Sequence, residues 1–301
     1  LVSKHAYIID FEEKEVQGSG IDWLINEAKK ANYFLVGEKH GLVEVTQLSS
    51  ALFKRLNEVG YNYAALEFGP IAALQVEKYL KKGGYPSLKK YLTSEKGYNS
   101  VAFLDWIEEA QMVADMFQSS SNKNMLFWGL DNEYIGSARA NLAVLLEYAT
   151  SKSQKKAISQ LDKILKENQF AYAGLTQEEL TTFTEKFRNI EEKKVTQLLD
   201  QFEFGHTIYS TWMNPYTRAK ANATREENMK DNFLNYISLA REKGDDKPKV
   251  FFKFGGFHSA PSINHVDGKI TLGTFIESYA KIHRQKAFNL FVLGTGQFGG
   301  D

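Results

Sequence analysis

Five short runs of apolar residues, rich in β-branched and aromatic side chains, are spaced along the chain. They occupy residues 33–37, 63–67, 125–130, 250–254 and 288–293. Runs of this length and composition predict buried strands, of the kind found in sheets that are covered on both faces.

Helical periodicity fills the intervals in the first half of the chain. Apolar residues recur at three- and four-residue steps from Val45 to Val59, and Gly60 follows the stripe. Residues 71–80 and 103–117 keep the same spacing. Strands that alternate with helices predict an α/β fold: a mostly parallel sheet with helices on both faces.

The middle of the chain shows helical stripes without a strand-like run. We therefore expect a large helical insertion at residues 136–244 that covers the site. Residues 1–135 and 245–301 would then form the α/β core domain that carries the site.

Local signals mark some expected boundaries. Residues 176–179 and 224–227 both have the Thr-x-x-Glu pattern of a capping box, which predicts two helix starts inside the insertion. Asp267-Gly268 lies between two short β-type runs and predicts a hairpin turn.

Composition narrows the classes of partner. The 37 basic residues balance 37 acidic ones, so no net charge draws the protein toward nucleic acid or an anionic membrane, and we expect a small-molecule substrate. The absence of cysteine excludes disulfides, thiolate nucleophiles and Cys-ligated zinc. Chemistry is left to histidines, carboxylates and hydroxyls.

The start of the chain bears on localisation. No stretch approaches the roughly 20 apolar residues of a membrane-spanning helix, and the first residues have neither an initiating Met nor the apolar segment of a signal peptide. We expect that a leader was removed, which favours a periplasmic or secreted protein over a cytoplasmic one.

Candidate catalytic residues follow the first predicted strand. Glu38 and His40 come where the strand gives way to a helix, the position at which open parallel sheets bind ligands. If the backbone stays extended, the two side chains share a face. The positive end of the helix that begins near Leu42 is expected to keep the His40 imidazole neutral, so that it can accept a proton.

Three further strands end in polar residues. Glu67 closes one strand, Asp131 follows another, and His258 comes after the turn at Gly255-Gly256. If the strands are parallel, their carboxyl ends meet at one edge of the sheet. We therefore expect Glu38, His40, Glu67, Asp131 and His258 to converge there.

The run Gly37-Glu38-Lys39-His40-Gly41-Leu42-Val43-Glu44 resembles the Gly-Glu-x-x-His-Gly-x-x-Glu signature of the erythromycin esterase-like family, which belongs to a wider group with ChaN-like haem-uptake proteins and Tiki-type metalloproteases. The gap between Glu38 and His40 is one residue shorter, as in the ChaN form. Ala65-Leu66-Glu67, Trp128-Gly129-Leu130-Asp131 and the run from Thr224 to Met229 resemble later esterase motifs, in the same order.

This resemblance implies a hydrolase that cleaves an ester, lactone or related acyl bond. His40 would be the general base that activates water, with Glu38, Glu67 and His258 completing the catalytic set. Arg225, Glu44 and Asp131 would bind the substrate, and Arg225 would stabilise an oxyanion. Ser49-Ser50 stand where the esterases carry an arginine, which argues against a macrolide substrate.

Two alternatives stay open. Hydrolysis with His40 as the base needs no cofactor. However, a divalent metal that acidifies water, as in Tiki-type proteins, could be bound by the same four side chains: Glu38, His40, Glu67 and His258. A ChaN-like protein would instead bind haem or another flat small molecule, with the 21 Phe, 15 Tyr and 4 Trp lining a cleft.

Overall fold

The computed structural model describes residues 6–12, 15–263 and 268–293. They fall into two compact units. The first draws on residues 1–67, 111–128 and 234–301, and the second consists of residues 68–110 and 129–233. Residues 68–110 thus belong to the second unit, whereas the sequence placed them in the α/β core.

The first unit is built on a five-stranded sheet with the strand order β5-β4-β6-β3-β7. Parallel pairing joins β4 to β6, β6 to β3 and β3 to β7, so the prediction of a mostly parallel α/β sheet is confirmed. The strands are β3 (Tyr33–Glu38), β4 (Tyr61–Leu66), β5 (Phe127–Gly129), β6 (Lys249–Gly255) and β7 (Ala287–Phe291).

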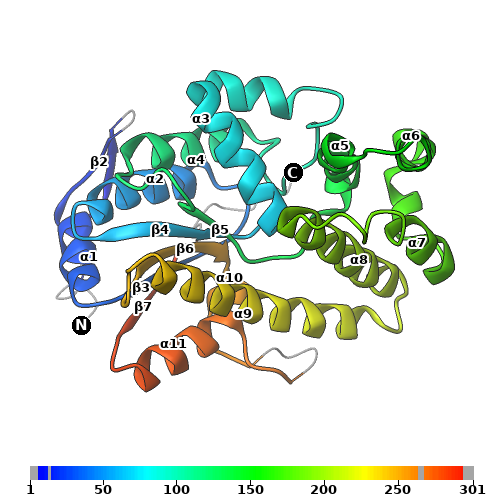
Figure 1. The fold of residues 1–301 in the computed structure, drawn as a ribbon. Helices are drawn as coiled ribbons and strands as arrows, with labels where there is room; N and C mark the ends of the chain where they lie inside the picture. Colours follow the sequence, from blue (N-terminus) through cyan, green and yellow to red (C-terminus); the bar gives the residue numbers. More distant parts are fainter. Residues whose placement is uncertain (1–5, 13–14, 264–267, 294–301) are drawn as a thin grey trace, which may run out of the picture. The chain divides into compact units, whose positions relative to one another are not determined.

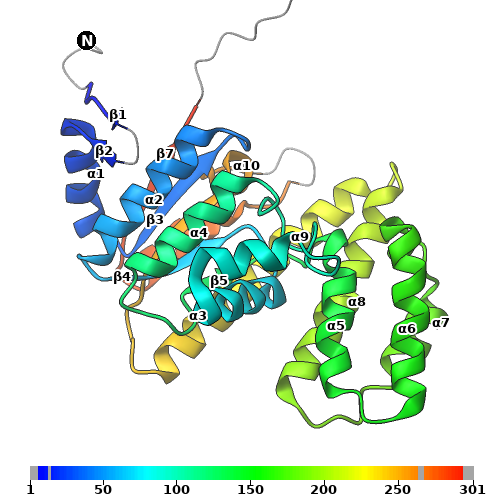
Figure 2. The ribbon, with the colours of Figure 1, turned by 90° about the horizontal axis from the view of Figure 1, so that it is seen from above.

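Helices cover both faces of this sheet, because each presents an apolar stripe to it. Figure 1 shows α2 (Val43–Asn57) on one face and α11 (Leu272–Ile282) on the other. In Figure 2, α2 and α4 (Ile107–Ser119) lie side by side, and Ser50 of α2 donates a hydrogen bond of 3.4 Å to Asp115 of α4.

The remaining elements of the first unit are the strand pair β1 (Asp10–Glu12) and β2 (Glu15–Gln17), and the helices α1 (Ser19–Lys29), α9 (Arg218–Glu242, shared with the second unit) and α10 (Gly256–Ser259).

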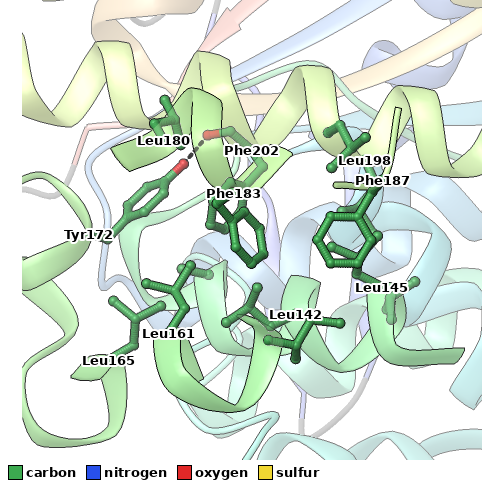
Figure 3. Close-up of a cluster of buried hydrophobic side chains, with 14 of the residues drawn as sticks. Leu142, Leu145, Leu161, Leu165, Tyr172, Leu180, Phe183, Phe187, Leu198 and Phe202 are labelled. Carbon is green, nitrogen blue, oxygen red and sulfur yellow. Dashed lines mark hydrogen bonds between the residues drawn. The ribbon is translucent and has the colours of Figure 1, made fainter. Parts of the chain in front are cut away.

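The second unit is helical and has its own core. Figure 3 shows this core, in which apolar side chains of α5, α6, α7 and α8 interlock around Phe183, Phe187 and Phe202. The Tyr172 hydroxyl donates a hydrogen bond to the backbone carbonyl of Phe202. The elements of the second unit are α3 (Pro70–Leu92), η2 (Ile135–Ser137), α5 (Ala138–Tyr148), α6 (Lys152–Glu167), η3 (Gln169–Tyr172), α7 (Gln177–Thr184) and α8 (Lys193–Met213).

One of the two predicted capping boxes is present. Thr176 caps α7, and its side chain and that of Glu179 satisfy each other's backbone amides. The second prediction is wrong: Thr224 lies inside α9, where its hydroxyl donates a hydrogen bond of 2.9 Å to the carbonyl of Lys220. A threonine can bond back to the preceding turn in this way, so the pattern alone does not define a helix start.

Two other boundaries depart from the sequence pattern. The helical stripe that was expected from residue 103 becomes α4 only at Ile107, and Phe103 takes a positive φ of 67°. At the predicted hairpin, Ile263 and Ile270 form an isolated antiparallel bridge. Asp267 of its turn lies outside the described residues.

Among the described residues the longest continuous helices are α9, with 25 residues, and α8, with 21, because non-helical backbone at Gly83 and Gly84 divides α3. None of the helices in residues 6–12, 15–263 and 268–293 is both long and apolar enough to cross a membrane.

Candidate functional site

The carboxyl ends of β3, β4 and β6 meet at one edge of the sheet. Residue 38 of β3 lies opposite Gly255 of β6, and Leu66 of β4 lies opposite Lys253. This register brings Glu38, His40, Glu67 and His258 together, as expected from parallel strands.

Glu38 holds one side of the His40 ring. Its Oε1 lies 3.0 Å from Nδ1 of His40 and 2.6 Å from Nζ of Lys253. Glu38 and Lys253 are both buried, whereas about a third of the His40 side chain is exposed. A buried carboxylate in contact with Nδ1 favours the tautomer that carries its proton there, which leaves Nε2 as the proton acceptor.

Glu67 lies between the two imidazoles. Its Oε2 accepts a hydrogen bond of 2.6 Å from the Gly255 amide and lies 3.7 Å from Nε2 of His40. Its Oε1 lies 3.6 Å from Nε2 of His258. Glu67 and His258 are buried, so His40 is the most exposed of the four side chains.

Two glycines permit this close assembly. A Cβ on Gly255 would lie 2.8 Å from Nε2 of His40, and a Cβ on Gly37 would lie 2.2 Å from Oγ of Ser259. Gly255 therefore leaves room for the imidazole, and Gly37 allows α10, which carries His258, to pack on β3.

The electrostatics of His40 differ from the sequence-based expectation. Burial and the charge of Lys253 lower the pKa of His40, but the hydrogen bond to Glu38 and the charges of Glu67 and Glu38 outweigh them and hold it above the ordinary 6.5. This direction is opposite to the one expected from the start of α2. Two carboxylates within 4 Å favour the charged form of the imidazole.

Lys253 is the member of the site that the sequence analysis missed. It pairs with Val36 in the parallel register, two residues before the end of β3 and on the same face as Glu38. A signal was available, because a lysine inside the apolar run Val250-Phe251-Phe252-Lys253-Phe254 needs a buried anionic partner.

Asp131, Arg225 and Glu44 are the three residues that were predicted to bind the substrate. Asp131 and Arg225 belong to the second unit, where the guanidinium forms two hydrogen bonds to the carboxylate, one of them 2.7 Å long. Glu44 is exposed in the first turn of α2. The charge of Arg225 is thus matched by Asp131.

Glu38, His40, Glu67 and His258 are also the candidate ligands for a divalent metal. In the described part of the chain, no three His, Asp or Glu side chains are grouped as metal ligands. Oε1 of Glu38 instead contacts the Lys253 ammonium, and Oε2 of Glu67 accepts a hydrogen bond from a backbone amide, whereas Oε2 of Glu38 is buried and has no hydrogen-bond partner among the described residues. The metal-dependent alternative therefore stays a prediction.

Comparison with known proteins places the fold. Three solved structures are similar over 90% of this chain: a Bacillus cereus protein (18% identity, TM-score 0.56, 68% of that chain), a mutant of the erythromycin esterase EreC in its open conformation (13%, 0.59, 72%) and a succinoglycan biosynthesis protein (19%, 0.52, 67%). No family model matches the sequence, and no curated protein matches it. At these identities the similarity is one of fold.

Proposed function

We propose that this chain is a hydrolase of the erythromycin esterase-like type, which cleaves an ester, lactone or related acyl bond with water activated by His40. The observation that carries the proposal is the position of His40. Its Nδ1 lies against the buried Glu38, and its Nε2 faces the Glu67 carboxylate from a partly exposed side chain.

The roles of the carboxylates follow from these contacts. Glu38 orients the ring and stabilises the imidazolium that forms when Nε2 takes a proton from water. A water molecule that hydrogen-bonds to both Nε2 of His40 and Oε2 of Glu67 would be oriented for attack, since the two atoms are 3.7 Å apart. The raised pKa of His40 makes it a stronger base than a free imidazole.

Lys253 and His258 support this base from the buried side. Lys253 places a positive charge against the buried Glu38 carboxylate and so compensates its charge. His258 lies 3.6 Å from the other oxygen of Glu67, and the Gly255 amide orients that carboxylate through a hydrogen bond of 2.6 Å. The fold similarity to an erythromycin esterase agrees with the proposed reaction class.

A direct test is hydrolysis of p-nitrophenyl acetate, p-nitrophenyl butyrate and a set of simple lactones by the purified chain and its His40→Ala variant. We expect activity that falls by about 10²–10⁴-fold in the variant and that is unchanged by a chelator. Equal activity of the two proteins would refute His40 as the base. Loss of activity on chelation, restored by a divalent metal, would favour the metal-dependent alternative.

A further inference from the structure

The second unit contains a pocket of about 580 Å³. Its size falls in the range of small-molecule sites, roughly 300–1,000 Å³. Aromatic side chains make up much of its wall: Phe103, Trp106, Tyr134, Phe170, Tyr209 and Trp212.

Two of these aromatic groups are partly exposed, and the Arg218 guanidinium lies over the Trp212 ring, 4.5 Å from its centre. Trp106 is 40% exposed and Trp212 is 45% exposed. Phe103, whose ring centre lies 5.8 Å from that of Trp106, adopts a positive φ that a bulky residue takes only when its surroundings hold it there. The loop before α4 therefore fixes an aromatic surface at the mouth of the pocket.

Another part of the wall belongs to a packed core. Ile135 lines the pocket and also belongs to the helical core of the second unit, on which Tyr134 and Tyr209 pack. A site whose wall is part of a packed core is largely formed before a ligand arrives.

Polar groups at the pocket set the charge of its ligand. The Arg225 guanidinium is matched by Asp131, and Asp105 adds a negative charge. The exposed Asp105 carboxylate can accept hydrogen bonds from hydroxyl groups of a ligand, whereas Oδ1 of Asn132 is buried out of a ligand's reach. The lining thus offers a hydrogen-bond acceptor and no surplus positive charge.

We propose that this pocket binds an uncharged molecule that joins a flat apolar ring system to hydroxyl groups, as an aryl glycoside does. The rings would stack on Trp106 and Trp212, and a hydroxyl would donate to the carboxylate of Asp105. An anionic ligand is disfavoured because Asp105 and Asp131 outnumber the single arginine of the described lining. Binding here does not depend on the hydrolysis proposed above.

The test uses calorimetric titration of the full chain with three probes. The first, 4-methylumbelliferyl glucoside, is neutral and has both an aromatic ring system and a sugar. The second, 4-methylumbelliferyl phosphate, joins the same aromatic ring system to an anion, and the third, methyl glucoside, has the sugar without the aromatic ring system. We expect saturable binding of the neutral aryl glucoside and binding at least about tenfold weaker for the other two.

The variants Trp106→Ala and Trp212→Ala should each weaken binding of the aryl glucoside by about tenfold. Tyr216→Ala is the matched control, because Tyr216 is an aromatic residue of the second unit that is 96% exposed and lies outside the pocket lining. Thermal melts of all three variants check the fold. No saturable heat with the aryl glucoside, equal binding of the phosphate, or unchanged binding in both tryptophan variants would overturn the proposal.

The binding test and the hydrolysis test can fail independently of each other. If His40→Ala abolishes hydrolysis but retains binding of the aryl glucoside, both proposals stand. Binding without any hydrolytic activity of the wild-type chain would refute the proposed function and leave the pocket assignment intact.

Discussion

Nζ of Lys253 lies 2.6 Å from Oε1 of Glu38. Both side chains are about 95% buried, so each charge depends on the other for compensation. The same oxygen of Glu38 contacts Nδ1 of His40. Loss of the ion pair should therefore affect both the stability of the fold and the orientation of the His40 ring.

Replacing Lys253 tests that coupling. Lys253→Met leaves a buried Glu38 without its ammonium partner and should lower the free energy of unfolding by about 3–5 kcal/mol, measured by urea denaturation. The double variant Lys253→Met with Glu38→Gln should recover a large part of that loss, because no uncompensated charge remains. Lys54→Met, an exposed position on α2, is the control. A single variant as stable as wild type would show that the pair is not needed to keep Glu38 buried.

The raised pKa of His40 predicts the pH dependence of hydrolysis. The base acts in its neutral form, so kcat/KM should rise with pH and level off, with an inflection above 6.5. Glu38→Gln removes a negative charge that raises this pKa and should move the inflection to lower pH. Glu58→Gln changes an exposed carboxylate at the end of α2 and should leave the profile in place. An inflection that does not move in Glu38→Gln would assign the titration to another group.

Gly255→Ala tests the space that the imidazole occupies. The new Cβ would lie 2.8 Å from Nε2 of His40 and 3.4 Å from Oε2 of Glu67, so the ring must shift. We expect kcat/KM to fall by about tenfold or more, because displacement of a catalytic group by a fraction of an ångström is costly. Gly174→Ala is the matched control, since its Cβ would have ordinary contacts, the nearest at 3.5 Å. Full activity of Gly255→Ala would place the productive position of His40 elsewhere.

Glu133 gives a pH-dependent stability that is separate from the site. Burial raises its pKa from 4.5 to about 7, although its Oε1 accepts hydrogen bonds from the amides of Ile71 and Ala72. Between pH 4.5 and 7 the folded chain keeps a proton that the unfolded chain releases. The stabilisation is therefore full below pH 4.5 and is lost as pH rises through 7, by up to about 3 kcal/mol.

Glu133→Gln keeps an acceptor for Ile71 and removes this titration. Its unfolding free energy, followed by denaturation from pH 4.5 to 8, should decline less steeply with pH than that of the wild type. Identical slopes for the two proteins would mean that Glu133 is already ionised throughout this range.

The sequence by itself determined the strands and the meeting of Glu38, His40, Glu67 and His258. Apolar runs of strand length specify a buried parallel sheet, and parallel strands necessarily bring their carboxyl ends to one edge. The helical middle of the chain was likewise visible in its periodicity, and its apolar stripes form the core of the second unit.

Only the tertiary structure decided the partners of each charge. Lys253 reaches Glu38 because β6 pairs with β3 in one register, and Asp131 binds Arg225 across 94 residues of sequence. The raised pKa of His40 depends on Glu67, which the fold brings near it, as well as on Glu38, its neighbour in sequence. Charges act through distances in space, and a linear pattern specifies such distances only within an element.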